Sequence, residues 1–548
     1  MNNTIRVGLL IDSFEMPAWI VEMIKKISAI RNVQIAVIIV NEDPLSTNSS
    51  QKARYPTIWS YRFYTKLDQL LYKVVPKASD IFDLRPFVID IPQLHIGTLN
   101  YGQKKQLKPA DINNIGRFKP DVLIKLGFEN LSGDILDLPR LGMWSMDCYK
   151  ERPDPFIPGT VQFFNNIGVT PSAVTQLSND PARERILYQS FTMTDEKSLN
   201  RSLNKIYWKS VSFIPRLLTM LAQFGEGGFW DLVDNITNSK KVYANATVNN
   251  RKIVKTFFDK TLTECKNRIS ALVNIRRWNL YFTAGGDNRI EIDPNVFKKV
   301  PGPKDAFWAD PNAVRVDNKT FIFFEEWDYK KNKGHISAIE FNDNSNPPVV
   351  LKVLDRPYHL SYPFTFQSNG TWYMIPETAA NHTIELYRCL NFPGEWEFVM
   401  NLMENIHAVD TTLYFYNNLW WLFANMVENA GASALDELFI FYAKDFLTTQ
   451  WTAHKMNPVI SDSRNARPAG ALFSIGNRIF RPSQCSDKIY GRCTNINEII
   501  VLTAENFSEV NVAALAPDGS DGSVGIHSYS KAGSLTFIDK FYSSNNRG

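Results

Sequence analysis

The first half of the chain alternates short apolar runs with amphipathic stretches. Residues 5–11 (IRVGLLI) and 33–40 (VQIAVIIV) are almost continuously apolar, so each predicts a buried strand. Residues 17–30 (PAWIVEMIKKISAI) place apolar side chains at helical spacing, and residues 86–90 (PFVID) and 121–128 (DVLIKLGF) predict further strands. This alternation predicts a mostly parallel sheet with helices on its faces, whose ligand would lie at the carboxyl ends of the strands.

A helical region follows this α/β pattern. Residues 196–223 have apolar positions at helical spacing and predict a helix, whereas residues 226–241 (EGGFWDLVDNITNSKK) lose that period. Residues 248–277 form a basic amphipathic segment that contains Phe257 and Phe258. Its apolar side predicts packing in a core, and peripheral contact with a membrane surface is the alternative.

The second half repeats one hairpin, in which an apolar strand, an Asn- or Gly-containing turn and an aromatic strand follow one another. Its copies are DPNAVRVDNKTFIFFE, YPFTFQSNGTWYMIPE, DTTLYFYNNLWWLFAN and the one-residue-shorter RPAGALFSIGNRIFR, which start at residues 310, 362, 410 and 467. Further strand patterns follow each copy. The copies start 48 to 57 residues apart, and repeats of this length, each with several strands, are typical of propeller blades.

A fifth blade fits residues 526–542 (IHSYSKAGSLTFIDKFY), closed by residues 279–285 (NLYFTAG) from the start of the domain. Such a closure joins the two ends of the ring and protects its strand edges. The sequence therefore predicts three regions: an α/β domain over residues 1–223, a helical linker over 224–277, and an all-β five-bladed propeller over 278–548.

Blade symmetry predicts which side chains meet. The first strand of every blade starts at one rim of the central channel and the second strand returns to it, so equivalent positions converge. The converging set is Asp310, Glu325 or Glu326, Tyr362, Glu377, Asp410, Asn425, Arg467, Arg481 and His527.

Carboxylates facing one cavity suit glycosidic chemistry, which needs a base to activate a hydroxyl or water and an acid to protonate the departing oxygen. The two arginines suit a substrate carboxylate or phosphate. Trp308, Tyr362 and Trp420 offer flat faces for sugar rings. The alternative is that the Asp-Pro and Asp-Thr-Thr pairs are turn and capping residues at strand starts.

Composition and charge limit the classes of partner and cofactor that the sequence predicts. A net charge of +4 over 548 residues includes no basic tract, so no nucleic-acid partner is predicted. The apolar run at the start is broken by Asp12 and is too short for a signal peptide or a membrane span, so no transmembrane segment is predicted. Five cysteines without a CxxC pair fit reduced thiols, and we expect a cytoplasmic protein without a metal site or a cofactor.

Residues 117–177 resemble the formyltransferase family, which includes methionyl-tRNA and sugar-nucleotide formyltransferases. The likeness covers about residues 1–220 and rests on a Pro-Asp before a strand, a Leu-Pro-x-x-Gly before the next one, and a later Gly-Val-Thr. The family's Asn-x-His falls here on Ser145 and Asp147, and Asp180 lies two residues from the position of its essential Asp. The resemblance therefore implies a Rossmann-type fold with a degenerate site.

Residues 300–540 resemble two kinds of propeller. WADP, RPYHLSYPF, IPETAAN, VDTT and ARPAG are similar to the N-terminal domain of plant glucosamine inositolphosphorylceramide transferases, in which catalysis is assigned to another domain. The arrangement also resembles five-bladed glycoside hydrolases. That second resemblance implies Asp310 as base, Glu377 as acid and Asp410 as the carboxylate that tunes the pair.

Three functions stay open at this point. The first is a carbohydrate-active protein of cell-surface polysaccharide or glycolipid biosynthesis, whose propeller transfers or hydrolyses a glycosyl unit. The second is a non-catalytic module that binds a glycan or a sugar nucleotide. The third is residual N-formyl transfer to an amino sugar by the first domain.

Overall fold

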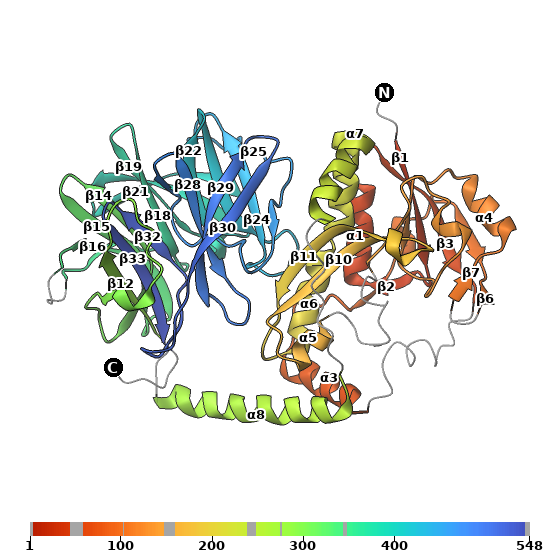
Figure 1. Ribbon diagram of the computed structural model, residues 1–548, viewed down its shortest axis with the longest axis horizontal. Helices are drawn as coiled ribbons and strands as arrows, with labels where there is room; N and C mark the ends of the chain where they lie inside the picture. Colours follow the sequence, from red (N-terminus) through yellow and green to blue (C-terminus); the bar gives the residue numbers. More distant parts are fainter. Residues whose placement is uncertain are drawn as a thin grey trace. The chain divides into compact units, whose positions relative to one another are not determined.

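The computed structural model describes residues 4–43, 59–101, 104–146, 159–237, 248–273, 277–343 and 348–542. The chain divides into two compact units, one of Met1–Phe258 with Asn429–Ala432 and one of Asp259–Glu428 with Ser433–Gly548. Figure 1 shows the two units with their elements labelled. The domain limits at residues 223 and 277 stay a prediction, and residue 223 lies inside a helix of the first unit.

A seven-stranded sheet forms the centre of the first unit. Five neighbouring strands, β9, β8, β1, β3 and β5, pair in parallel, and β10 and β11 add an antiparallel edge next to β9. The predicted mostly parallel sheet is therefore confirmed. The strands in spatial order are β11 (Arg185–Met193), β10 (Val169–Leu177), β9 (Met143–Ser145), β8 (Val122–Lys125), β1 (Ile5–Ile11), β3 (Val33–Asn41) and β5 (Gln93–Ile96). Two small antiparallel pairs accompany it: β2 (Glu15–Pro17) with β4 (Ile81–Asp83), and β6 (Leu99–Tyr101) with β7 (Lys104–Gln106).

Helices cover both faces of this sheet because its strands are apolar on both sides. Leu9 of β1 packs in a cluster with residues of α1, α6 and α7, whereas its neighbour Leu10 packs in a second cluster with Ile115 of α4. This alternation is what a strand buried on both faces requires. The helices are α1 (Ala18–Ser28), α3 (Trp59–Leu71), α4 (Pro109–Gly116), α5 (Thr160–Phe164), α6 (Leu199–Ser210), α7 (Phe213–Thr237) and α8 (Asn250–Val273).

Three local predictions in the first half were wrong. Residues 86–90 form a 3₁₀ turn, η1 (Arg85–Phe87), and not a strand, since Pro86 has no N–H for a ladder and Phe87 and Ile89 are exposed. The predicted single helix over 196–223 is two helices, α6 and α7, with Pro215 in the first turn of the second. The helix also continues through 226–237, beyond a non-helical kink at Gly225.

The second unit is a propeller of five blades, as predicted. The first three blades are β14 (Ala306–Val316), β15 (Lys319–Asp328), β16 (Lys333–Phe341) and β17 (Leu351–Leu354); β18 (Ser361–Ser368), β19 (Thr371–Glu377), β20 (Thr383–Asn391) and β21 (Glu395–Glu404); and β22 (Ala408–Tyr416), β23 (Leu419–Met426), β24 (Glu437–Ala443), β25 (Thr452–Ala453) and β26 (Ile460–Ser461). The fourth is β27 (Phe473–Ile475), β28 (Arg478–Cys485), β29 (Cys493–Leu502) and β30 (Phe507–Leu515).

The fifth blade closes the ring with strands from both ends of the domain. It contains β32 (Tyr529–Ala532), β33 (Leu535–Tyr542), β12 (Arg277–Ala284), β13 (Lys298–Lys299) and β31 (Ser523–Gly525). β12 pairs with β33 over its full length, from Arg277 opposite Tyr542 to Ala284 opposite Leu535. The predicted closure is therefore confirmed, and it gives the ring no free edge at the chain junction.

Candidate active site at the propeller axis

The first strands of three successive blades carry the same irregularity. Asp310, Tyr362 and Asp410 each adopt a left-handed backbone conformation, with φ of 52°, 42° and 53°. At each of them the pairing with the second strand shifts, in a β-bulge. Non-glycine residues rarely adopt this conformation, and such strain is found at ligand sites more often than elsewhere. The bulges aim the three side chains at one place in the ring.

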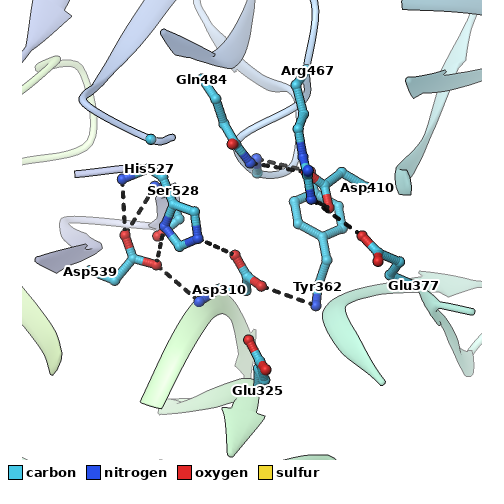
Figure 2. A network of polar contacts seen from close by, with 12 residues as sticks. Asp310, Glu325, Tyr362, Glu377, Asp410, Arg467, Gln484, His527, Ser528 and Asp539 are labelled. Carbon is cyan, nitrogen blue, oxygen red and sulfur yellow. Dashed lines mark hydrogen bonds and ion pairs between the residues drawn. The ribbon is translucent and has the colours of Figure 1, made fainter. Parts of the chain in front are cut away.

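The second strands return to that place in equivalent positions. Glu325, Glu377 and Asn425 lie opposite the residue just before each bulge, in blades 1, 2 and 3. Figure 2 shows Glu325 and Glu377 close to Asp310, Tyr362 and Asp410. The sequence repeat thus predicted the convergence of the first three blades correctly.

Arg467 of the fourth blade holds two of the carboxylates. Its Nε and Nη2 donate to the two oxygens of Asp410, at 2.5 and 3.1 Å, and Nη2 lies 3.4 Å from Glu377 Oε2. Gln484 Nε2 donates to Asp410 Oδ2 at 2.9 Å. All of these side chains are largely buried, and the bidentate arginine fixes the orientation of the Asp410 carboxyl group.

Asp310 lies on the other side of the ring, against a histidine and a second aspartate. His527 Nε2 is 3.3 Å from Asp310 Oδ1, and His527 Nδ1 is 2.7 Å from Asp539 Oδ2. Asp539 also accepts backbone N–H bonds from Asp310, His527 and Ser528 at 3.0 to 3.1 Å. Figure 2 shows these polar contacts. The imidazole ring also stacks on Trp278, with ring centroids 3.8 Å apart, and this stacking fixes the plane of the imidazole.

The charges of these groups follow from burial and from one another. Burial lowers the pKa of His527, but the carboxylates of Asp539 and Asp310 outweigh that effect and raise the pKa overall. Burial alone would raise the pKa of Asp539, yet the imidazolium and the backbone N–H groups lower it below its usual range. The raised pKa of His527 and the lowered pKa of Asp539 favour the charged forms of both groups, an imidazolium facing a carboxylate.

The carboxylic acids that face the ring differ from each other in their affinity for a proton. Burial, with Asp410 and Asp539 nearby, raises the pKa of Asp310 to about 6 although His527 opposes the rise. Burial and the charge of Asp410 raise the pKa of Glu377 well above its usual range, despite Arg467. Glu377 therefore holds its proton more tightly than Asp310, and such a difference between two carboxyl groups is what acid–base catalysis needs.

Glu325 is another buried carboxyl group at this rim. Burial and the charges of Asp310 and Glu377 raise its pKa well above the usual range. Its neighbour Glu326 behaves in the opposite way. Burial raises the pKa of Glu326, but bonds from His335, Ser337 and Trp308 lower it overall.

Several buried polar atoms around the ring have no hydrogen-bond partner. Among the described residues these include both amide atoms of Asn425, the Oε1 atom of Gln484 and the Oγ atom of Ser528. Asn425 is fully buried, and Ser528 lines a small hollow with Asp310 and Tyr362. Unpaired buried polar groups are costly, and in native proteins they mark functional positions or sites of ordered water.

In the part of the chain that the structure describes, one group of three side chains is close enough together to hold a metal ion: Asp310, His527 and Asp539. Their ligand atoms lie within 4.8 Å of one another. A metal ion, however, needs a free imidazole lone pair, and both nitrogens of His527 already face carboxylates. The three residues fit a charged hydrogen-bonded chain better than a ligand set.

Two of the predicted substrate contacts are packing groups. Trp308 is only 3% exposed; its Nε1 lies 3.4 Å from Glu326 Oε1, and its ring packs on Phe324. Tyr362 is buried, and its hydroxyl contacts Thr412 Oγ1 and accepts a bond from Gly470 N, both at 2.9 Å. Neither ring offers a free face for a sugar. Trp420 packs likewise in the aromatic cluster with Phe366 and Phe446.

Arg481 is likewise not at the rim. In the fourth blade Pro468 pairs with Ser483, so Arg481 lies two residues before the position equivalent to Glu377. Its guanidinium bonds to both carboxylate oxygens of Glu509 on β30, at 2.8 and 2.6 Å, and to the carbonyl oxygen of Asn465. The shorter fourth copy of the hairpin was the signal that its register differs.

Sequence reasoning missed Asp539, Gln484 and Tyr490. Asp539 is a lone acid inside the apolar run LTFIDKFY, a pattern that could have identified it. Tyr490 lies in the β28–β29 loop, 38% exposed, with its ring 5.1 Å from the guanidinium of Arg467 and edge-on to His527. Unlike Trp308, it is partly exposed.

The predicted remnant of a second site in the first unit is only partly described. Ser145 ends β9 and is fully buried opposite Thr175 of β10. Asp180 is exposed, caps η3 (Pro181–Arg183) by accepting from Ala182 N at 3.0 Å, and lies 3.5 Å from Arg183. Asp147 lies outside the described residues. The formyltransferase resemblance therefore stays a prediction.

Comparison with known proteins supports the predicted relationship of the propeller. The family model for the N-terminal region of glucosamine inositolphosphorylceramide transferase 1 matches residues 298–526. The transferase of that name from Oryza sativa subsp. japonica is 34% identical over 209 residues, which are 38% of this chain and 28% of the relative. The one from Arabidopsis thaliana is 32% identical over 209 residues, 38% and 27% of the two chains. The match thus spans under a third of the relatives' length.

Solved structures with a similar arrangement include two α-L-arabinofuranosidases. The enzyme from Podospora anserina in complex with cellotriose has a TM-score of 0.35 at 12% identity, over 49% of this chain and 98% of that one. The GH62 catalytic domain from Coprinopsis cinerea has a TM-score of 0.33 at 14% identity, over 48% and 97%. These scores add nothing to the five-bladed arrangement that the strand pairing itself establishes. The sequence of residues 298–526 is similar to the transferase N-terminal family, and that similarity is the relationship the comparisons support.

Proposed function

We propose that the propeller acts on a glycosyl substrate by carboxylate acid–base chemistry, in the assembly of a cell-surface polysaccharide or glycolipid. The observation that carries this proposal is the pair Asp310 and Glu377, which share one rim but hold their protons to different degrees. Asp310 would take a proton from the attacking hydroxyl or water, and Glu377 would give one to the departing glycosidic oxygen.

The remaining groups have positioning roles in this proposal. His527 and Asp539 orient the Asp310 carboxylate, and Arg467 fixes Asp410 beside Glu377. The unpaired amide of Asn425 and the partly exposed side chain of Tyr490 would contact the sugar. The relatives' name, which contains glucosamine and inositolphosphorylceramide, supports a glycolipid substrate class.

A non-catalytic binding module is the second candidate, and one observation favours it. Arg467 is shared by Asp410 and Glu377, so these two carboxylates are already engaged by a cation within the protein. Carboxyl groups tied to an arginine in this way suit a structural or positioning role better than proton transfer. Residual formyl transfer by the first unit is the third proposal, and its key residue Asp147 lies outside the described residues.

One experiment separates the first two candidates. Sugar nucleotides and oligosaccharides are screened against the full chain by thermal shift, because a ligand that binds only the folded state raises the Tm. Compounds that bind are then incubated with wild type, Asp310→Asn, Glu377→Gln and the exposed control Asp445→Asn, and products are analysed by mass spectrometry.

The catalytic proposal expects wild type and Asp445→Asn to convert a bound glycoside or sugar nucleotide. The two site variants should still bind it but turn it over about 10²- to 10⁴-fold more slowly. Binding without conversion by any of the four proteins would establish the binding module instead. If no carbohydrate raises the Tm, both candidates are wrong.

A further inference from the structure

A basic aromatic surface lies on the first unit, on the outer side of α3 and the first turns of α8. Helix α3 turns Tyr61, Tyr64 and Asp68 inward, where they are buried. Its outward side chains include Trp59, 65% exposed, and Phe63, 60% exposed, which lie one turn apart. An isolated exposed apolar residue is ordinary, but large aromatic rings gathered on one helix face indicate an interaction surface.

Helix α8 adds to the same surface. Ile253 is buried, while Phe258 is 64% exposed. Phe63 and Phe257 pack edge to face, with ring centroids 6.5 Å apart, so the two helices present one continuous aromatic area. A hollow lies between the two helices, and most of the side chains that line it are apolar. The lining residues are Trp59, Ser60, Phe63, Tyr64, Ile253, Val254, Phe257 and Phe258.

The exposed charged side chains around this aromatic area, on α3 and on residues 250–258 of α8, are positive. Arg62 and Lys66 are exposed on α3, and Arg251 and Lys255 are exposed on α8. The acid on this part of α3, Asp68, is buried, accepts bonds from Ser198 Oγ and Asn200 N, and does not reach the surface. Asp259 is the exposed acid that follows directly.

We propose that this surface, made of the outer face of α3 and residues 250–258 of α8, docks on an anionic phospholipid bilayer. Aromatic side chains are favoured at the headgroup level of a bilayer, where the apolar face of the ring contacts lipid and its edge contacts water. Basic side chains beside them attract the phosphates of anionic lipids. The apolar hollow takes part of a lipid acyl chain, and the ring of cations selects a bilayer over an apolar protein face.

This docking is independent of the chemistry proposed for the propeller, and no spanning segment is needed for it. In the described residues no helix is long and apolar enough to cross a bilayer. An interfacial helix with an aromatic face and a basic flank binds in the plane of the membrane, and its affinity depends on both buried apolar area and lipid charge.

The test is flotation of the full chain with vesicles of phosphatidylcholine alone and of phosphatidylcholine mixed with phosphatidylglycerol. Three variants are compared with wild type: an aromatic one (Trp59→Ser, Phe63→Ser, Phe258→Ser), a charge one (Arg62→Glu, Lys66→Glu, Lys255→Glu), and a control in which the exposed propeller side chains Phe398 and Phe415 become Ser. All replaced side chains are exposed, so folding, checked by circular dichroism, should be kept.

We expect wild type and the control to float with the anionic vesicles and to bind phosphatidylcholine alone at least about tenfold more weakly. The aromatic and charge variants should each lose at least about tenfold in affinity for anionic vesicles. Absence of flotation, or flotation equal in all four proteins, overturns the proposal. So does a wild-type dimer that the aromatic variant converts to a monomer without any vesicle binding, because the surface would then join two copies.

Discussion

Arg467 donates from Nε and Nη2 to the two carboxylate oxygens of Asp410, at 2.5 and 3.1 Å, across two blades whose hairpins start 57 residues apart in the chain. This bidentate pair is buried, and Nη2 also reaches Glu377. A single guanidinium therefore connects the second, third and fourth blades at the rim of the propeller.

Loss of this cation should destabilise the protein strongly. In Arg467→Met the buried Asp410 loses its bidentate partner and the buried Glu377 loses its nearby cation, and we expect a loss of about 3–5 kcal/mol in the free energy of unfolding. The control is Arg464→Met, which breaks the more exposed pair with Asp462 and should cost less than about 1 kcal/mol. Urea unfolding measures both. Equal losses would show that the rim pair has no special role.

The pH dependence of turnover follows from the two carboxyl groups. Because the pKa of Asp310 is raised to about 6, its basic form is abundant only above that pH, and the rate should rise through about pH 6. Glu377, with its pKa raised well above the usual range, keeps its proton at neutral pH and loses it at higher pH, so the rate should fall again. A bell-shaped profile of kcat/KM is expected, and a flat one would contradict these roles.

Neighbouring glutamates should respond oppositely to amidation. A carboxyl whose folded pKa lies above its unfolded value loses stability as the pH rises, because the folded state must give up a proton that it holds tightly. Glu325→Gln removes this loss, so its Tm should equal or exceed that of wild type at pH 8 but not at pH 5.

Glu326→Gln is the matched control for this measurement. The folded pKa of Glu326 is lowered, so its carboxylate contributes stability above its unfolded pKa, and that stability is lost as the pH falls through the folded pKa. The variant should have a lower Tm than wild type at pH 8. If both variants change the Tm in the same direction at pH 8, the assigned charges are wrong.

Gly470 should tolerate no side chain. It has φ of 144°, and a Cβ atom there would lie 2.2 Å from the carbonyl oxygen of Tyr529. Gly470→Ala should lose more than about 2 kcal/mol of stability, since it combines backbone strain with this contact. Gly476, with φ of 59° and open space around it, is the control; Gly476→Ala carries strain alone, about 1 kcal/mol. Thermal unfolding of the two variants distinguishes these cases.

Arg481 should matter for stability and not for ligand binding. Arg481→Leu leaves Glu509 buried without its partner, and we expect a loss of about 3–5 kcal/mol. Arg481→Leu combined with Glu509→Leu removes both charges and should recover most of that loss. Carbohydrate affinity, measured by calorimetry on the double variant, should match wild type. A large drop in affinity would return Arg481 to the site.

The period of the hydrophobic pattern was sufficient for the architecture. Strand-length apolar runs alternating with helical ones indicated the parallel sheet, and the repeated hairpin indicated the blades and the closure of β12 on β33. The first pattern is read at spacings of two or 3.6 residues, and the second from copies of one hairpin that start 48 to 57 residues apart. Errors arose where one residue changed the local geometry, as at Pro86, which cannot donate to a ladder.

The rim residues divide in the same way. Asp310, Tyr362 and Asp410 were found because their three copies have equal lengths and the same bulge. Arg481 was placed wrongly because the fourth copy is shorter and pairs in another register. Trp308 was expected to be accessible and is buried, whereas Tyr490 is exposed and was not identified. Exposure depends on what the neighbouring blade covers, and no single blade contains that information.

The sequence by itself determined which elements form and that acidic side chains recur at equivalent positions of a ring. Only the tertiary structure decided which of them hold a proton, which cation each one meets, and that Asp539 and Gln484 complete the set. The physical reason is that propensity and periodicity act along the chain, whereas burial and charge pairing act between strands that are distant in it and adjacent in space.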